Sequence, residues 1–279
     1  MKQFLWLLVL VTWQTCAATT DRPPFFYVEG PEGHAWLLGS VHVGKADFYP
    51  FPKMIEDAYL QADALALEAD TESPQVASLM QAYLLADEPL PQQVEAELNQ
   101  YCQQKGLQCH TQLAPWILSS QLAMAIMAES GYDAQSGVES YFRSKAEVKP
   151  IRELEGMKFQ LDMFDSLPRQ TQLEMLQAAM EPIDVEELIN SWRSGDHQGL
   201  AKLTEEEMAS DPHAWQVLML DRNQSMSATL KGWLAEPANL FVIIGAGHLV
   251  GQHSIPKALT AMGVKVTDCW QQRCPTPTP

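Results

Sequence analysis

The chain has 279 residues, of which 46% are hydrophobic and 19% are charged, and its formal net charge at pH 7 is −17. Lysine and arginine are nowhere concentrated enough to neutralise a row of phosphates, which excludes a nucleic-acid-binding protein. The acidic residues are spread along helical stretches and are typical of a solvated surface. A chain of this length suits one elaborated domain with a sizeable hydrophobic core.

The first 18 residues have the features of a signal peptide. Lys2 precedes an almost unbroken apolar run over residues 4–11, and small side chains follow at 16–18. The run is shorter than the roughly 20 residues that a membrane-spanning helix needs, and no later segment reaches that length. We therefore predict an exported chain, periplasmic or secreted, without an integral membrane span. Lipid anchoring at Cys16 is not expected, because the residues before it are bulky and polar.

Short apolar runs predict the strands of one sheet, and helical periodicity fills the chain between most of them. The first two runs could pair as a hairpin through the glycine-containing turn at 29–33. The helix expected at 52–62 would make a crossover to the third strand, which implies some parallel pairing. The predicted strands are residues 25–28, 35–39, 64–68, 149–154 and 240–245, with 264–269 as a sixth candidate.

The long middle of the chain is helical in character. Residues 73–142 and 156–234 are rich in alanine, leucine, glutamine, glutamate and methionine, with prolines as breaks. We expect an α/β fold in which a mixed sheet carries a large helical layer or cap. The expected organisation is a signal peptide over 1–18, a single domain over 19–274 and a disordered tail over 275–279.

Four cysteines remain once the leader is removed, and they form two local pairs. Cys102 lies close in sequence to Cys109, and Cys269 to Cys274. Three connectivities are possible, and closure of short loops favours the two local disulfides. A metal site from these four is the competing interpretation, but neither pair has the spacing of a zinc knuckle.

One short motif occurs twice, each time at the end of a predicted strand. Gly39 is followed three residues later by His42, and Gly245 by His248. Glycine permits a sharp turn, with positive φ, or a close approach of the backbone to a ligand. The carboxyl ends of strands are where open α/β folds place their sites. A single histidine after a strand is usually a surface residue, but the repeated spacing indicates two imidazoles that could converge on one metal ion.

Carboxylates stand at two further strand ends. Glu68 closes an apolar run, and alternation along the fourth predicted strand puts Glu153 and Glu155 on one face. A solvated loop start is the simpler explanation for Glu68. Two histidines with one carboxylate form an open site typical of Zn²⁺, Mn²⁺ or Fe²⁺. Arg222, expected late in a helix that begins near Pro212, could orient Glu68 or stabilise an oxyanion, although an exposed helix charge is the plainer reading.

The chain resembles the TraB/PrgY/GumN family, which is similar to the Tiki metalloproteases, from about residue 25 to residue 270. The resemblance implies a divalent metal bound through the two Gly-x-x-His motifs, and hydrolysis of peptide bonds in the Tiki branch. The matching segments are Leu-Gly-Ser-Val-His-Val-Gly at 38–44, Tyr-Pro at 49–50, Leu-Glu at 67–68, Ala-Pro-Trp at 114–116, Gly-Val-Glu-Ser-Tyr-Phe at 137–142, Leu-Glu at 154–155, Asp-Arg-Asn at 221–223 and Gly-Ala-Gly-His at 245–248.

Carried onto this sequence, the resemblance implies a site with named members. His42 and His248 would hold the metal, and Glu68, Glu155 and Arg222 are carried over as the acidic and basic residues of the catalytic site. From its place at a strand end, we expect Glu68 to be a metal ligand as well. Two positions depart from the family pattern: Glu139 stands where aspartate is usual, and Gly156 stands where threonine is usual.

The leading hypothesis is a metal-dependent hydrolase, a peptidase acting on a peptide or protein substrate. The ion would be Mn²⁺, Co²⁺ or Zn²⁺, and Glu155 or Glu68 would act as general base. No His-Glu-x-x-His helix occurs, which excludes an ordinary zincin. The alternative is a periplasmic protein that sequesters a peptide or a metal without turnover. Turnover of a peptide library with added metal would distinguish the two.

Overall fold

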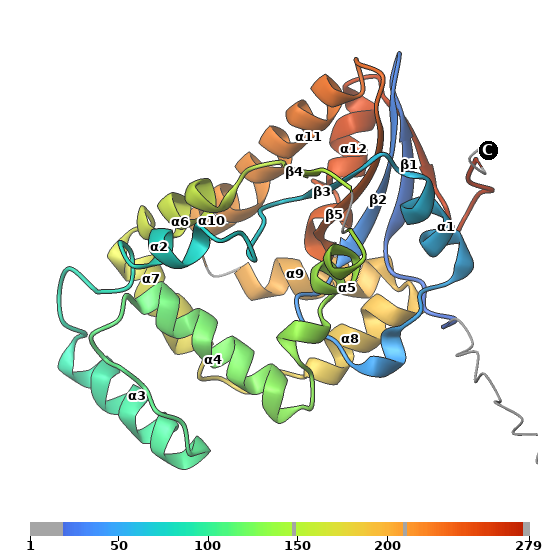
Figure 1. Ribbon diagram of the computed structural model, residues 1–279. Coiled ribbons are helices and arrows are strands. Elements are labelled where there is room, and N and C mark those ends of the chain that lie inside the picture. Colours follow the sequence, from blue (N-terminus) through green and yellow to red (C-terminus); the bar gives the residue numbers. More distant parts are fainter. Residues whose placement is uncertain (1–18, 147–148, 209–210, 276–279) are drawn as a thin grey trace, which may run out of the picture.

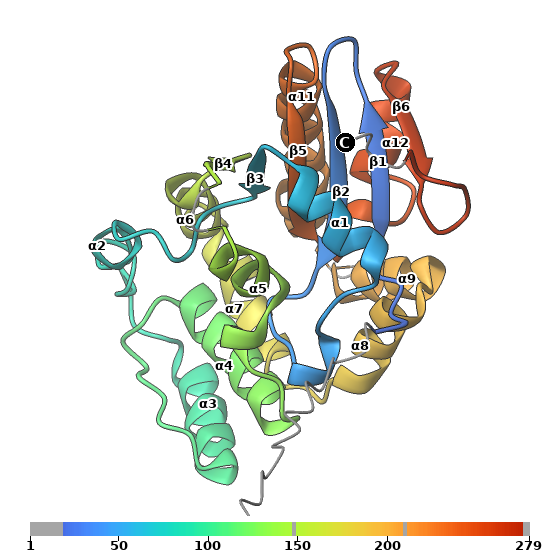
Figure 2. The ribbon, with the colours of Figure 1, turned by 45° about the vertical axis from the view of Figure 1, so that its right-hand side comes forward.

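A computed structural model of the protein describes residues 19–146, 149–208 and 211–275 (Figures 1 and 2). Its centre is a six-stranded mixed sheet in the order β4-β3-β5-β2-β1-β6. The predicted signal peptide, and all of the predicted tail except Pro275, lie outside the described residues. The strands are β1 (Phe25–Glu29), β2 (His34–Ser40), β3 (Ala64–Leu67), β4 (Ile151–Glu153), β5 (Asn239–Gly245) and β6 (Lys265–Asp268).

All six predicted strands are confirmed, with bounds that shift by one or two residues. The largest difference is at β4, which begins at Ile151 rather than 149. Pro150 cannot donate to a ladder, and its carbonyl group accepts the N–H of Leu65 just before the strand starts. The predicted α/β class with a mixed sheet is confirmed as well.

The sheet is parallel over β4, β3, β5 and β2 and antiparallel at its other end, over β1 and β6. β1 pairs antiparallel with β2, as the predicted hairpin, and with β6 on its other side. β5 lies between β2 and β3 and runs parallel to both, and β3 runs parallel to β4. The first crossover passes through α1 (Lys53–Gln61), close to the helix predicted at 52–62. Four neighbouring strands therefore end at the same edge of the sheet.

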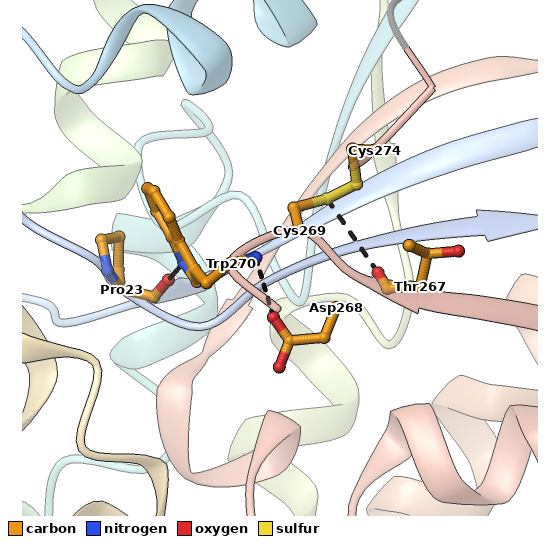
Figure 3. The surroundings of a disulfide bond; sticks show 6 residues. All are labelled: Pro23, Thr267, Asp268, Cys269, Trp270 and Cys274. Atoms are coloured by element: carbon orange, nitrogen blue, oxygen red, sulfur yellow. Dashed lines mark hydrogen bonds between the residues drawn. A yellow bond between two sulfur atoms is a disulfide. The ribbon is translucent and has the colours of Figure 1, made fainter. Parts of the chain in front are cut away.

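Both predicted disulfides are confirmed. Cys102–Cys109 closes the end of α3 (Gln92–Lys105), and Cys269–Cys274 closes the chain beyond β6. Figure 3 shows how the second one is anchored: the indole N–H of Trp270 donates to the carbonyl oxygen of Pro23 over 2.6 Å. The C-terminal loop is therefore tied to the segment that leads into β1.

Each face of the sheet has its own core, because side chains alternate along the strands. Trp36 and Phe241 point to one face, where α1, α5 (Val138–Ser144) and α8 (Val185–Ser194) pack. Leu37 and Val242 point to the other face, against α11 (Arg222–Trp233) and α12 (Ile255–Ala261). In Figure 1, α11 and α12 lie together beside β5 and β2.

A helical layer extends away from the carboxyl edge of the sheet, as predicted for the middle of the chain (Figures 1 and 2). Leu98, Leu118 and Leu176 belong to a separate small core between α3, α4 and α7. α9 instead packs against α8 and the segment that carries His248. The bounds are α2 (Val76–Met80), α4 (Pro115–Glu129), α6 (Met157–Asp165), α7 (Arg169–Ala178) and α9 (His197–Met208), with short 3-10 turns η1 (Ala46–Phe48), η2 (Ala134–Ser136) and η4 (Ala246–Leu249).

The helix expected from Pro212 differs from its prediction. α10 (Pro212–Trp215) continues as the π-helical segment η3 (Gln216–Asp221) and then as α11, so Arg222 lies in the middle of a continuous helix and not late in it. The wider π turn rotates the residues that follow relative to an unbroken α-helix. Arg222 and its neighbour Asn223 are both buried.

None of the helices in the described segments combines the length and the apolar character needed to cross a bilayer.

Candidate functional site

The register of the sheet brings Glu68 beside Gly245. Ser40 pairs with Gly245 across β2 and β5, and Leu67 pairs with Ile243 across β3 and β5. Glu68, the first residue beyond β3, therefore reaches the end of β5. Its Oε1 accepts a hydrogen bond from the backbone N–H of Gly245 over 2.6 Å.

The two glycines of the repeated motif are required by close approach and not by an unusual backbone angle. Neither Gly39 nor Gly245 has positive φ, so a left-handed turn does not explain either glycine. A Cβ atom on Gly39 would lie 2.9 Å from Pro24 Cβ, inside normal contact distance. A Cβ atom on Gly245 would lie 3.3 Å from Glu68 Oε1 and 3.6 Å from Cδ2 of His248. Glycine at 245 lets the carboxylate and the imidazole share one small space.

Arg222 joins two carboxylates from different strand ends. Its Nη2 donates to Glu68 Oε2 over 2.5 Å and to Glu155 Oε2 over 2.8 Å, and its Nε donates to Glu155 Oε1 over 2.9 Å. Gln160 on α6 adds a third contact, since its Nε2 donates to Glu155 Oε2 over 3.0 Å and to Glu68 Oε2 over 3.3 Å. The guanidinium group and the side-chain amide hold both carboxylates in fixed positions.

Glu68 and Arg222 stay charged although they are buried. Burial by itself would raise the pKa of Glu68, but His248, Arg222, His42 and the N–H of Gly245 lower it to about 2. Burial opposes the charge of Arg222, but Glu68 and Glu155 outweigh it and raise the Arg222 pKa. Paired charges of this kind are costly to separate, because removal of one leaves the other buried without a partner.

His248 is a buried, oriented imidazole. Its residue is 6% exposed, and Nδ1 lies 2.6 Å from Asn223 Oδ1. The Asn223 amide is fixed in turn, because its Nδ2 donates to the carbonyl oxygen of His253 over 2.8 Å. Oδ1 must therefore accept, so Nδ1 carries the proton and Nε2 keeps its lone pair. Burial lowers the pKa of His248 to about 4, against the opposing charge of Glu68.

His42 occupies the opposite kind of environment. Its side chain is 72% exposed, and Nδ1 lies 3.0 Å from Glu139 Oε1. Glu139 comes from α5 and also accepts a hydrogen bond from Ser40 Oγ over 2.6 Å. The charge of Glu139 and the contact with it raise the pKa of His42 to about 9. As in His248, the Nδ1 side of the ring is held by an oxygen atom from a separate helix.

An open cavity of about 590 Å³ lies beside these groups. Residues of the segments that follow β2 and β3 line it, together with residues of η2, α4, α5, α6 and α11. His248 and Glu155 do not line it, and the side chain of Glu155 is only 1% exposed. The lining residues that matter for chemistry and recognition are His42, Glu68, Glu139, Gln160, Phe164 and Arg222.

The imidazole and carboxylate groups of this site are of the kinds that bind divalent metals, but in the described parts of the chain they are not arranged as a complete set of ligands. Over residues 19–146, 149–208 and 211–275, no three His, Cys, Asp or Glu side chains are positioned together to hold an ion. Histidine ligands of metals nevertheless share one property, which is that the nitrogen facing away from the metal donates to a carboxylate or carbonyl oxygen. His42 and His248 both have that property, through Glu139 and Asn223. By donor chemistry, therefore, these residues fit such an ion.

Three of the residues that hold the site together were given no role from the sequence. Asn223 orients His248, Gln160 bridges Glu68 and Glu155, and Glu139 contacts His42. Asn223 and Glu139 lie inside the segments that carried the family resemblance. The sequence therefore marked both positions but did not show what their side chains contact. Gln160 had no sequence signal, because a glutamine on a helix is an ordinary surface residue.

Comparison with known proteins agrees with the resemblance seen in the motifs. A model of the TraB/PrgY/gumN family matches residues 25–268. An uncharacterized protein from Treponema pallidum (strain Nichols) is 23% identical over 291 residues, covering 90% of this chain and 88% of its own length. The uncharacterized protein YbaP is 27% identical over 245 residues in both Shigella flexneri and Escherichia coli (strain K12), covering 81% of this chain and 88% of its own length. None of the solved structures matches the chain.

Proposed function

Since the chain belongs to the TraB/PrgY/gumN family, we propose that it is a metal-dependent hydrolase that cleaves peptide bonds in a peptide or protein. One observation carries the proposal: the two repeated histidines each have Nδ1 held by an oxygen acceptor, which leaves Nε2 of each ring for a ligand. The similarity of these motifs to those of Tiki metalloproteases is the reason for proposing a peptide bond.

His42, His248 and Glu68 would hold the ion, which would be Mn²⁺, Co²⁺ or Zn²⁺. Such an ion would polarise a carbonyl group and make water more acidic. The ring of His42 is largely exposed and is held through Glu139, whereas His248 and Glu68 are fixed by Asn223, Arg222 and the N–H of Gly245.

The roles of the two predicted base residues differ in this proposal. Glu68 lines the cavity, so it would contact water or substrate. Glu155 is 1% exposed and its oxygen atoms are engaged by Arg222 and Gln160, so it would act as a positioning residue for Arg222. Arg222 would orient Glu68, since the Nε and Nη2 hydrogens are all directed at carboxylates.

That engagement of Arg222 also favours a second candidate function. A guanidinium group that donates to Glu68 and Glu155 has little capacity left to stabilise an oxyanion, and only Nη1, 3.5 Å from Leu218 O, is loosely held. The second candidate is an exported protein that sequesters a peptide or a metal without turnover.

Metal content tests the ligand set. The chain would be purified without a histidine tag, and bound Mn, Co and Zn would be measured by mass spectrometry alongside His42→Ala and His248→Ala. We expect bound metal in the unaltered chain and loss of it in both variants. His110→Ala is the matched control, because His110 is an exposed histidine outside this site, and it should retain the metal. Equal metal content in all four proteins would refute the site.

Turnover separates the two functions. A peptide library would be incubated with the chain and each of the three ions, and products would be read by mass spectrometry. Cleavage that disappears in Glu68→Gln would support the hydrolase. Metal or peptide binding without any cleavage would favour sequestration.

A further inference from the structure

One face of α6 is turned toward the cavity. Gln160 and Phe164 are four residues apart, so they lie one above the other on the same side of the helix, and both line the cavity. Phe159 on the same helix is 45% exposed and does not line it. The helix therefore carries a polar group and an aromatic ring one turn apart beside the proposed chemistry.

Gln160 has a free acceptor at this position. The Nε2 atom of its amide donates to Glu155 Oε2 over 3.0 Å and to Glu68 Oε2 over 3.3 Å, which fixes the orientation of the amide. Its Oε1 accepts no hydrogen bond from any side chain or backbone group in the described parts of the chain. A carbonyl oxygen next to Glu68 would accept an N–H, which is the donor that a peptide backbone offers.

Phe164 has one ring face fixed from behind. It stacks on Trp116, with ring centroids 5.4 Å apart and an angle of 12° between the planes, and Trp116 is buried. Met124 on α4 also lines the cavity and is 38% exposed. A rigid aromatic ring and an adaptable methionine that line the same cavity suit large apolar groups of varied shape.

The charges around the cavity favour a neutral apolar group over a charged one. Each carboxylate that lines it has a cationic or imidazole partner: Arg222 for Glu68, His42 for Glu139 and Arg143 for Glu72. A charged ligand side chain would compete with these pairs, whereas an apolar side chain would gain from burial.

We infer that α6 is the substrate-recognition helix: Gln160 Oε1 accepts a backbone N–H of a peptide, and Phe164 with Met124 packs on a large apolar side chain beside that bond. The inference rests on the proposed function for the identity of the ligand as a peptide. It concerns binding, so it is tested without turnover.

The experiment measures affinity for four fluorescent pentapeptides, each with glycine at four positions and phenylalanine, leucine, serine or glutamate in the centre. Binding is measured by fluorescence anisotropy with the purified, oxidised chain. A chelator is present so that no metal-dependent cleavage occurs. We expect the phenylalanine and leucine peptides to bind about tenfold more tightly than the serine peptide, with glutamate weakest. Phe164→Ala and the more exposed Met124→Ser should each reduce this preference, and at least one of them should fold.

Gln160→Met should weaken the binding of all four peptides by a similar factor, roughly fivefold, because it removes a hydrogen bond to the peptide backbone. Phe159→Ala, the control on the other side of the helix, should change none of the affinities. The inference is overturned if the four peptides bind equally or not at all, or if Phe159→Ala acts like Phe164→Ala. Peptide cleavage is assayed separately with Mn²⁺ and tests only the proposed hydrolase activity. If no cleavage occurs but apolar peptides still bind more tightly, the hydrolase proposal fails and the inference about α6 holds.

Discussion

The two Gly-x-x-His segments follow neighbouring parallel strands, yet they put their histidines into opposite surroundings. His248 is 6% exposed, and its pKa is lowered to about 4 by burial. His42 has a side chain that is 72% exposed, and its pKa is raised to about 9 by Glu139. The same Gly-x-x-His spacing therefore does not determine the environment of the histidine.

What differs is the element that covers each histidine. α11 supplies Asn223 to His248, and it also supplies Arg222 to the carboxylates beside that ring. α5 supplies only Glu139 to His42, at the rim of the open cavity. The buried half of the site should thus be important for folding, and the exposed half should be important for ligands alone. Four measurements test this contrast.

The largest effect is expected at Arg222. Arg222→Met should lower the free energy of unfolding by about 3–5 kcal/mol, because Glu68 and Glu155 would remain buried without their partner. Arg143→Met is the matched control, since Arg143 also bridges two carboxylates, Asp70 and Glu72, but is more exposed. It should cost about 1 kcal/mol or less. Urea unfolding of both variants measures the difference, and equal losses would contradict the contrast.

Asn223→Ala should produce the next largest loss in the free energy of unfolding, about 1–3 kcal/mol. It removes the only side chain that contacts Nδ1 of His248 among the described residues, and it leaves the carbonyl oxygen of His253 without its donor. If the metal site is as proposed, affinity for the ion should also fall by about 10–100-fold, because the ring is no longer oriented. Urea unfolding and metal titration measure the two quantities. Unchanged stability would show that the hydrogen bond is not important for folding.

The strand ends of this site could be predicted from the sequence, but the contacts between them and the helices could not. Gly245 and Glu68 were identified because an apolar run that ends on glycine or on a carboxylate can be recognised in the sequence alone. The pairing of Leu67 with Ile243 then fixes their distance, since strand register is regular.

The helical contributions depend on turns that periodicity does not reveal. The π-helical segment before Arg222 changes which side chains face inward, so a helix drawn with uniform period misplaces Arg222 and Asn223. Glu155 was expected to share a strand face with Glu153, but β4 ends at Glu153. Glu153 then accepts the N–H of Asp70 while Glu155 turns to Arg222.

The third prediction concerns pH and the buried histidine. The pKa of His248 is about 4 in the folded chain, below the ordinary 6.5 expected when it is unfolded. The unfolded chain binds this proton first as the pH falls, so stability is full above about 6.5 and is lost as the pH falls toward 4. In chelator the loss should reach about 1.4 kcal/mol per pH unit at most. Many carboxylates also titrate in this range, so the slope of the free energy of unfolding against pH is compared between the unaltered chain and His248→Gln. Identical slopes would refute a lowered pKa for His248.

The smallest effect on stability is expected at the exposed histidine. Glu139→Gln keeps an oxygen acceptor for Ser40 and for Nδ1 of His42 but removes the charge that raises the His42 pKa. Without metal, the pKa of His42 measured by NMR should fall from about 9 toward 6.5. A raised pKa stabilises the folded chain at low pH, and that contribution is lost as the pH rises through about 9. Because the ring is mostly solvated, the variant should cost no more than about 1 kcal/mol at neutral pH.

The same substitution should weaken binding of the proposed ion by about 10–100-fold, because the ring loses the negatively charged partner that makes it a better ligand. A large effect on affinity with a small effect on stability is the signature that separates His42 from His248, where both quantities should fall together. Urea unfolding, NMR titration and metal titration of this variant therefore decide whether the two halves of the site are divided as we describe. A loss of stability as large as that of Asn223→Ala would show that Glu139 is part of the structural core, and the division would be wrong.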